Sequence, residues 1–150
     1  MPHYFLDSSA LVKRYRKGVG TPWVLQLSAA ANRLIVSRLA HIEVASAIIR
    51  RGRQSAGAAQ AMTSALGSLE SEIDSDFDVV EFTAPVTSRA MDLVRVHGLR
   101  AADAIQLACA LLSSAELPAV ADFYLVSADD ELNDAAAAEG LHLENPNQHP

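Results

Sequence analysis

Short apolar runs alternate with helical patterns along most of the chain, and this alternation limits the fold more than any other feature. The runs Tyr4–Leu6, Leu34–Val36, Val79–Phe82, Phe123–Val126 and Leu141–Leu143 have the length and the apolar character of buried strands. Strands that are separated by helices predict a parallel sheet covered on both faces. We therefore expect an α/β fold with a central, mainly parallel sheet of about five strands.

Capping residues and glycines predict where several helices begin and end. Ser8 or Ser9 is expected to cap the first helix, because a hydroxyl accepts a bond from an unpaired backbone N–H. Thr21 should cap the second helix, with proline at its first position. A third helix should end at Gly52, and residues 55–73 should form its antiparallel partner. The most apolar helix is expected over residues 100–115.

The length of 150 residues predicts one domain, over residues 1–146, followed by a frayed tail over residues 147–150. No apolar run has the length of a membrane span, and the N-terminus has no pattern typical of a secretory signal. Cys109 is the only cysteine. These features predict a cytoplasmic protein.

The charges are distributed unevenly along the chain. Residues 1–53 contain nine of the twelve basic side chains and only two acids, a net charge of +7. Because the whole chain has a net charge of −6, the remainder carries −13. A basic first third of this kind favours a polyanion or an acidic partner, although solvated helix faces would produce the same count.

Four of the acids stand where a charge is hard to accommodate. Asp7 ends the first strand, and Asp129 follows the fourth. Glu43 has apolar neighbours on its helix, and Asp103 lies in the first turn of the most apolar helix. The carboxyl ends of neighbouring parallel strands meet at one edge of a sheet, so we expect these side chains to converge. Like charges gathered there require a cation, and oxygen ligands suit Mg²⁺ or Mn²⁺.

A carboxylate-bound metal beside a basic surface is the arrangement that phosphodiester hydrolysis requires. Simpler explanations exist for each acid alone. A helix cap would account for Asp7 or for Asp129, and the adjacent Asp130 is an alternative to Asp129 as the fourth acid.

Four segments together resemble the successive motifs of PIN-domain ribonucleases, and most closely those of the VapC toxins of bacterial and archaeal toxin–antitoxin pairs. The segments are Leu6–Lys13, Ile42–Ala47, Leu99–Ala108 and Leu125–Asp129. The closing stretch Glu139–Pro146 is similar to the last strand of that family. The resemblance covers nearly the whole chain in the expected order. It implies a three-layer α/β/α sandwich.

The resemblance also implies function and partners. It implies Mg²⁺- or Mn²⁺-dependent endonucleolytic cleavage of RNA, a homodimer, and inhibition by a cognate VapB-like antitoxin. By position, Asp7, Glu43 and Asp103 match the three core acids, and Asp129 matches the fourth. Gln106 stands where many members carry histidine, which puts a role for that side chain in doubt.

We expect Asp7 and Asp103 to hold the catalytic metal, with Glu43 and Asp129 completing its outer contacts or a second site. Ser9 and Ser127 match hydroxyl positions that would orient the metal's surroundings. Basic side chains near these motifs are candidates for contacts with RNA phosphates. They are Lys13, Arg14, Arg50 and Arg51.

Two other functions remain open from the sequence. A phosphohydrolase of the haloacid-dehalogenase type also begins with a strand and an aspartate, but Ser9 occupies the place of its second aspartate and no lysine follows Lys17. A non-catalytic PIN-like module would bind RNA or an antitoxin without cleaving. Such a module would gain stability by losing the four acids, which counts against it.

Overall fold

The computed structural model describes all residues from 1 to 150, and its centre is one parallel sheet of five strands in the order β3-β2-β1-β4-β5. The strands are His3–Leu6 (β1), Arg33–Ser37 (β2), Asp78–Val80 (β3), Phe123–Val126 (β4) and His142–Glu144 (β5). All four neighbouring pairs are parallel. The strand order reverses between β1 and β4, so this pair forms the switch point at which α/β proteins bind ligands.

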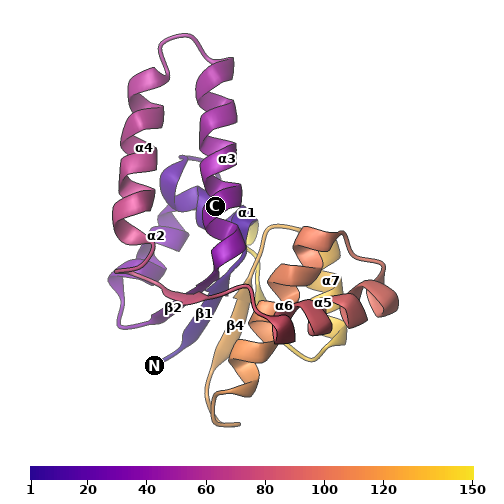
Figure 1. The fold of residues 1–150 in the computed structure, drawn as a ribbon. Helices are drawn as coiled ribbons and strands as arrows, with labels where there is room; N and C mark the ends of the chain where they lie inside the picture. Colours follow the sequence, from indigo (N-terminus) through magenta and orange to yellow (C-terminus); the bar gives the residue numbers. More distant parts are fainter.

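Seven α-helices and one 3₁₀ helix surround the sheet. They are Ser8–Tyr15 (α1), Thr21–Ala29 (α2), Arg38–Gln54 (α3), Ala59–Glu72 (α4), Ala84–His97 (α5), Ala101–Ala115 (α6), Asp130–Ala138 (α7) and Pro146–Gln148 (η1). Figure 1 shows α3 and α4 as a hairpin that projects well beyond the sheet, with α5, α6 and α7 gathered on the other side. No helix combines the length and hydrophobicity that a membrane crossing requires.

The strands place alternate side chains in two separate cores, which makes the molecule three-layered. Phe5 and Leu125 pack with the helices α5, α6 and α7, whereas Leu6 and Val126 pack with α1, α2, α3 and α4. Successive side chains of a strand point to opposite faces, so each short apolar run contributes to both cores. The expected α/β/α sandwich with a five-stranded parallel sheet is confirmed.

The predicted caps Ser8 or Ser9 and Thr21 are wrong, whereas the alternative that Asp7 is a helix cap is confirmed. Asp7, rather than Ser8 or Ser9, caps α1, because its Oδ1 accepts a hydrogen bond of 3.0 Å from the N–H of Ala10. Gly20 stands at the cap of α2 with φ of 83°, and Thr21 is already the first helical residue. The left-handed backbone at this position favours glycine over threonine.

Gly52 does not end α3, which continues to Gln54. A methyl group at Gly52 would lie 2.5 Å from Met62 Sδ and 2.8 Å from Met62 Cβ. The glycine therefore serves the close approach of α3 to α4 rather than a helix end.

The C-terminal residues, for which the sequence predicts fraying, contact the rest of the domain in this structure. The ring of His149 stacks on Trp23 of α2, with centroids 4.2 Å apart and planes 4° from parallel. His149 Nε2 also lies 2.9 Å from Glu144 Oε2. Aromatic stacking against a neighbouring helix holds this short tail against the domain.

Candidate active site

Asp7 lies at the carboxyl end of β1 with only 4% of its surface exposed. Both carboxylate oxygens accept hydrogen bonds, Oδ1 from Ser9 Oγ at 2.7 Å and Oδ2 from Ser127 Oγ at 2.6 Å. Burial raises the pKa of Asp7 to about 6, although these hydrogen bonds act in the opposite direction. Asp7 thus caps α1 through Oδ1 and is at the same time a buried acid at the switch point.

Ser9 and Ser127 lie where the sequence predicts supporting hydroxyls. Besides donating to Asp7, Ser9 Oγ accepts from the N–H of Ala128 at 2.9 Å, and Ser127 Oγ accepts from the N–H of Asp129 at 3.0 Å. These bonds join the start of α1 to the loop after β4. They therefore fix the position of the Asp7 carboxylate relative to Asp129.

Glu43 is half-buried on α3, and one of its oxygens is held by two neutral donors. Oε1 accepts from Ser8 Oγ at 2.6 Å and from Gln106 Nε2 at 3.1 Å. Gln106 is only 2% exposed and also accepts from Ser37 Oγ at 2.8 Å. Because this bond fixes which end of the amide is the acceptor, Nε2 must face Glu43.

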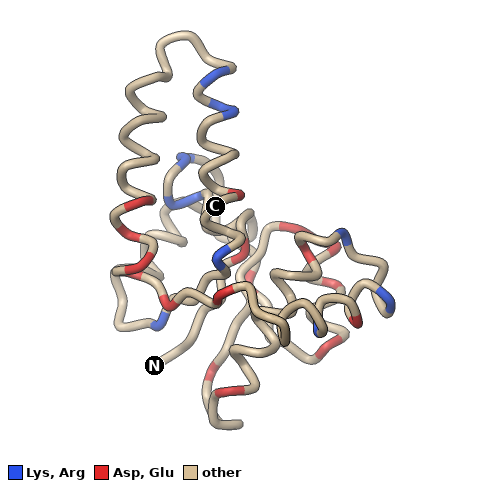
Figure 2. The backbone as a smooth tube through the Cα atoms, viewed as in Figure 1, with Lys and Arg blue, Asp and Glu red and all other residues tan.

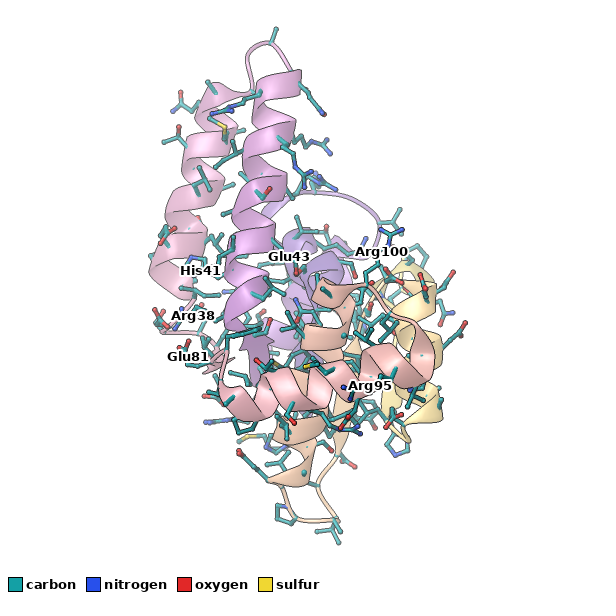
Figure 3. All side chains as sticks on the ribbon, turned by 45° about the vertical axis from the view of Figure 1, so that its right-hand side comes forward. Arg38, His41, Glu43, Glu81, Arg95 and Arg100 are labelled. Carbon is teal, nitrogen blue, oxygen red and sulfur yellow. The ribbon has the colours of Figure 1, made fainter.

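Asp103 lies in the first turn of α6, half-buried. Burial raises its pKa, and the negative charges of Asp129 and Glu43 raise it further. The charge of Arg100, at the cap of α6, acts in the opposite direction. Figure 3 labels Glu43 on α3 and Arg100 just before α6, and the charges of both residues act on the pKa of Asp103.

Asp129 caps α7, as the simpler explanation from the sequence proposes, with Oδ1 accepting from the N–H of Leu132 at 3.0 Å. Its charge nevertheless contributes to the raised pKa of both Asp7 and Asp103. Asp130 is exposed and contributes to neither. Asp129 is therefore the one of this pair that belongs to the acid cluster.

Charge effects link the four predicted acids, because Asp129 raises the pKa of Asp7 and of Asp103, and Glu43 raises that of Asp103. We call Asp7, Glu43, Asp103 and Asp129 the acid cluster. Its donors are carboxylate oxygens, which suit a hard divalent cation. No three acidic, histidine or cysteine side chains already stand together as metal ligands. The chemistry of the donor set fits Mg²⁺ or Mn²⁺, whereas the carboxylates are not pre-arranged around a single point.

Two of the four side chains that the sequence predicts to contact RNA phosphates bind other groups of the protein instead. Arg14 has a side chain only 11% exposed and forms ion pairs with Glu72 at 3.1 Å and Asp76 at 2.7 Å. Lys13 Nζ donates to the carbonyl of Val19 at 2.7 Å. Arg14 therefore has a structural role, linking α1 to α4 and to the residues that follow α4.

The other two predicted contacts, Arg50 and Arg51, are exposed and face different hollows. Arg50 lines a groove of about 420 Å³, together with Ser8, Ser9 and Glu43. Arg51 lines a separate pocket near the end of α1. Arg50 is therefore the predicted cation that shares a groove with a member of the acid cluster, Glu43.

Sequence reasoning missed the roles of Ser8 and Gln106. Ser8 was considered only as a helix cap, but its hydroxyl donates to Glu43. Gln106 follows Asp103 by one helical turn in the most apolar helix, and residues with that spacing share a helix face. A polar side chain on the same face as a buried acid was the available signal.

A parallel α/β/α sandwich with an acid cluster at its switch point defines a class of proteins whose ligand site lies at the carboxyl edge of the sheet. The family model of the PIN domain matches residues 4–138, and the chain belongs to this family.

The relatives identify a narrower group. The chain is 34% identical over 148 residues to ribonuclease VapC45 and to ribonuclease VapC49, both of Mycobacterium tuberculosis, with 95% of this chain and 95% of each relative covered. Among solved structures, PAE2754 from Pyrobaculum aerophilum has a TM-score of 0.70 at 18% identity, covering 99% of this chain and 86% of that one. A toxin–antitoxin complex from Klebsiella pneumoniae has a TM-score of 0.62 at 18% identity, covering 95% of this chain and 97% of that one.

Proposed function

We propose that the protein is a metal-dependent endoribonuclease that acts as the toxin of a toxin–antitoxin pair. The observation that carries the proposal is the acid cluster, in which burial and neighbouring negative charge raise the pKa of Asp7 and Asp103. Maintaining such a cluster in a folded protein is costly unless a cation compensates it. The similarity to VapC ribonucleases over 95% of the chain supports RNA as the substrate.

In this proposal Asp7 and Asp103 hold Mg²⁺ or Mn²⁺, and Glu43 and Asp129 complete its outer contacts. A divalent cation bound there would polarise the scissile phosphate and compensate the charge of the leaving oxygen. The remaining steps belong to the chain itself. Ser9 and Ser127 hold the Asp7 carboxylate through both oxygens.

Glu43 is oriented from one side only, because Ser8 and Gln106 both donate to its Oε1. No hydrogen bond occupies Oε2, which leaves this oxygen for a cation or for a water molecule near it. Arg50 and Arg100 supply positive charge beside the cluster, Arg50 along the groove and Arg100 near Asp103. In our proposal these two cations bind the phosphates on either side of the cut.

The partner proposed for this chain is a VapB-like antitoxin, and the similarity of its fold to that of a toxin–antitoxin complex supports an antitoxin partner. A homodimer remains a prediction from the family resemblance. Expression of the chain together with its neighbouring reading frame, followed by purification and mass measurement, tests both. Recovery of the chain alone and monomeric would contradict both.

Cleavage of a fluorescent single-stranded RNA tests the activity. The wild type should cleave with Mg²⁺ or Mn²⁺ and not with a chelator, whereas Asp7→Asn and Asp103→Asn should each lose at least about 100-fold in rate. Asp130→Asn is the matched control, because Asp130 neighbours the cluster without joining it. Wild-type rates in a folded Asp103→Asn variant would refute the assignment.

A further inference from the structure

A second hollow with positively charged walls lies at the far end of α1 and α3 from the acid cluster. It has a volume of about 230 Å³, and we call it the basic pocket. Its walls include Tyr15, Arg16, Lys17, Ile48, Arg51 and Met62. The sequence predicts a phosphate contact for Arg51 among its cations, and Arg16 and Lys17 follow the C-terminal end of α1.

The three cations of the basic pocket are not neutralised by the protein. Five arginines elsewhere pair with acids: Arg14, Arg33, Arg38, Arg89 and Arg95. Arg16, Lys17 and Arg51 form no ion pair and are exposed. Figure 2 shows basic residues along the outer part of α3 and at the end of α1, while acidic residues lie mainly nearer the sheet. An anion from outside the protein is therefore the natural counter-charge.

The pocket also contains an aromatic ring with a fixed orientation. Tyr15 donates its hydroxyl to Glu72 Oε2 at 2.8 Å, which anchors the ring between α1 and α4. Ile48 and Met62 add an apolar floor. A ring and apolar side chains surrounded by cations are the features with which proteins bind single-stranded nucleic acid, since bases stack on the ring while cations contact phosphates.

The basic pocket and the groove that adjoins the acid cluster are two separate hollows formed along the same two helices, α1 and α3. The groove is lined by Ser8, Ser9 and Val12 of α1 and by residues 42–44, 46, 47 and 50 of α3. The pocket is lined by residues 15–17 at the end of α1, by Ile48, Arg51 and Gly52 of α3, and by residues of α4 and the residue before it. Glu43 and Arg51 are eight residues apart, which corresponds to about 12 Å along a helix. A strand of a few nucleotides would span this distance.

We propose that the basic pocket binds single-stranded RNA on one side of the cleavage point, with phosphates against Arg16, Lys17 and Arg51 and a base on Tyr15. This inference rests on the proposed function and adds the path of the substrate. An acidic peptide would satisfy the charges, but it would leave the oriented ring and the route to the acid cluster without a use.

RNA affinity of the Asp103→Asn variant tests the pocket without cleavage. Fluorescence anisotropy with a ten-nucleotide RNA compares Asp103→Asn with the same variant carrying Arg16→Gln, Lys17→Gln and Arg51→Gln. We expect affinity to fall by tenfold or more, and the slope of log K against log salt to decrease by about 2, as the loss of three phosphate contacts predicts. Arg33→Gln with Arg95→Gln, which removes cations elsewhere, should leave both values unchanged.

The base contact and the path are tested separately. Tyr15→Leu should weaken binding by about tenfold, and Tyr15→Phe, which keeps the ring, should retain most of the affinity. In the active protein, the triple variant should raise KM for the ten-nucleotide RNA and leave cleavage of a trinucleotide unchanged. If the triple variant lost the same factor in kcat/KM for both substrates, the proposed path of the RNA through the basic pocket would be wrong.

Two further results would overturn the proposal. One is wild-type RNA affinity and salt slope in the triple variant. The other is an unchanged RNA affinity combined with lost binding of polyglutamate, which would make the pocket a protein interface. If the wild type does not cleave RNA but the triple variant still loses RNA affinity, the endoribonuclease proposal fails and the RNA-binding pocket stands.

Discussion

Gln106 Nε2 lies 3.1 Å from Glu43 Oε1, although the two residues are 63 positions apart. The other end of the same amide accepts from Ser37, which caps the helix that carries Glu43. One buried side chain therefore links β2, α6 and α3 at the acid cluster. In VapC-like chains with histidine at this position, an imidazole would offer a donor and an acceptor to the same neighbours.

Replacing the amide of Gln106 should disturb the orientation of Glu43 without changing the binding of RNA. Gln106→Leu removes the acceptor of the buried Ser37 hydroxyl and one of the two donors to Glu43 Oε1, which lets Glu43 move. We therefore expect a loss of about 1–3 kcal/mol in the free energy of unfolding. We also expect kcat for RNA cleavage to fall by about tenfold with little change in KM. Gln106→His should recover part of kcat. An unchanged kcat in the folded Gln106→Leu variant would show that the amide does not position Glu43.

The buried Asp7 should make the metal-free protein less stable as the pH rises. Its pKa is raised from 3.8 to about 6, so between these values the folded state binds more protons than the unfolded state. The free energy of unfolding should therefore decrease from about pH 4 to pH 6, by about 3 kcal/mol from this residue, and then level off.

Urea denaturation from pH 4 to pH 7 in the presence of a chelator measures this change. The comparison is with Asp7→Asn, which cannot ionise at this position and should lack the decrease. Identical pH profiles for the two proteins would mean that Asp7 ionises as readily in the folded chain as in the unfolded one.

Added Mg²⁺ or Mn²⁺ should raise the melting temperature, because a cation that binds only the folded state stabilises it. A concentration of 100 times Kd corresponds to about 2.7 kcal/mol. Calorimetric scans at pH 7 with increasing metal provide the measurement, and Asp103→Asn should show a smaller rise. No shift with either metal would count against a cation site in the acid cluster.

Two glycines inside helices should respond in opposite directions to alanine. Gly52→Ala places a methyl group 2.5 Å from Met62 Sδ and should destabilise the domain by about 1–3 kcal/mol. Gly67, within α4, has no atom within 4 Å of such a methyl group, so Gly67→Ala should stabilise by up to about 1 kcal/mol. Thermal melts of both variants check the contrast. Equal changes in melting temperature for the two variants would mean that α3 and α4 move apart to accommodate the methyl group at position 52.

The sequence by itself determined the elements and singled out the candidate acids. Apolar runs bounded by caps and glycines predict all five strands, because a strand buried on both faces needs a continuous apolar segment and little else. Asp7, Glu43, Asp103 and Asp129 were identifiable because charge in an apolar context is costly and therefore conspicuous. The parallel direction of the strands followed from the same alternation.

Tertiary structure alone decided which polar groups meet. Gly52 resembles a helix end in sequence but lies against Met62, a neighbour on another helix. Arg14 and Arg51 are both basic residues of the first third of the chain. Only Arg14 forms ion pairs, with Glu72 of α4 and with Asp76 after it, so Arg51 keeps an unpaired charge. Hydrogen bonds and ion pairs act only over a few ångströms. Which chain segments come that close depends on how the two cores pack, and the local sequence pattern does not show it.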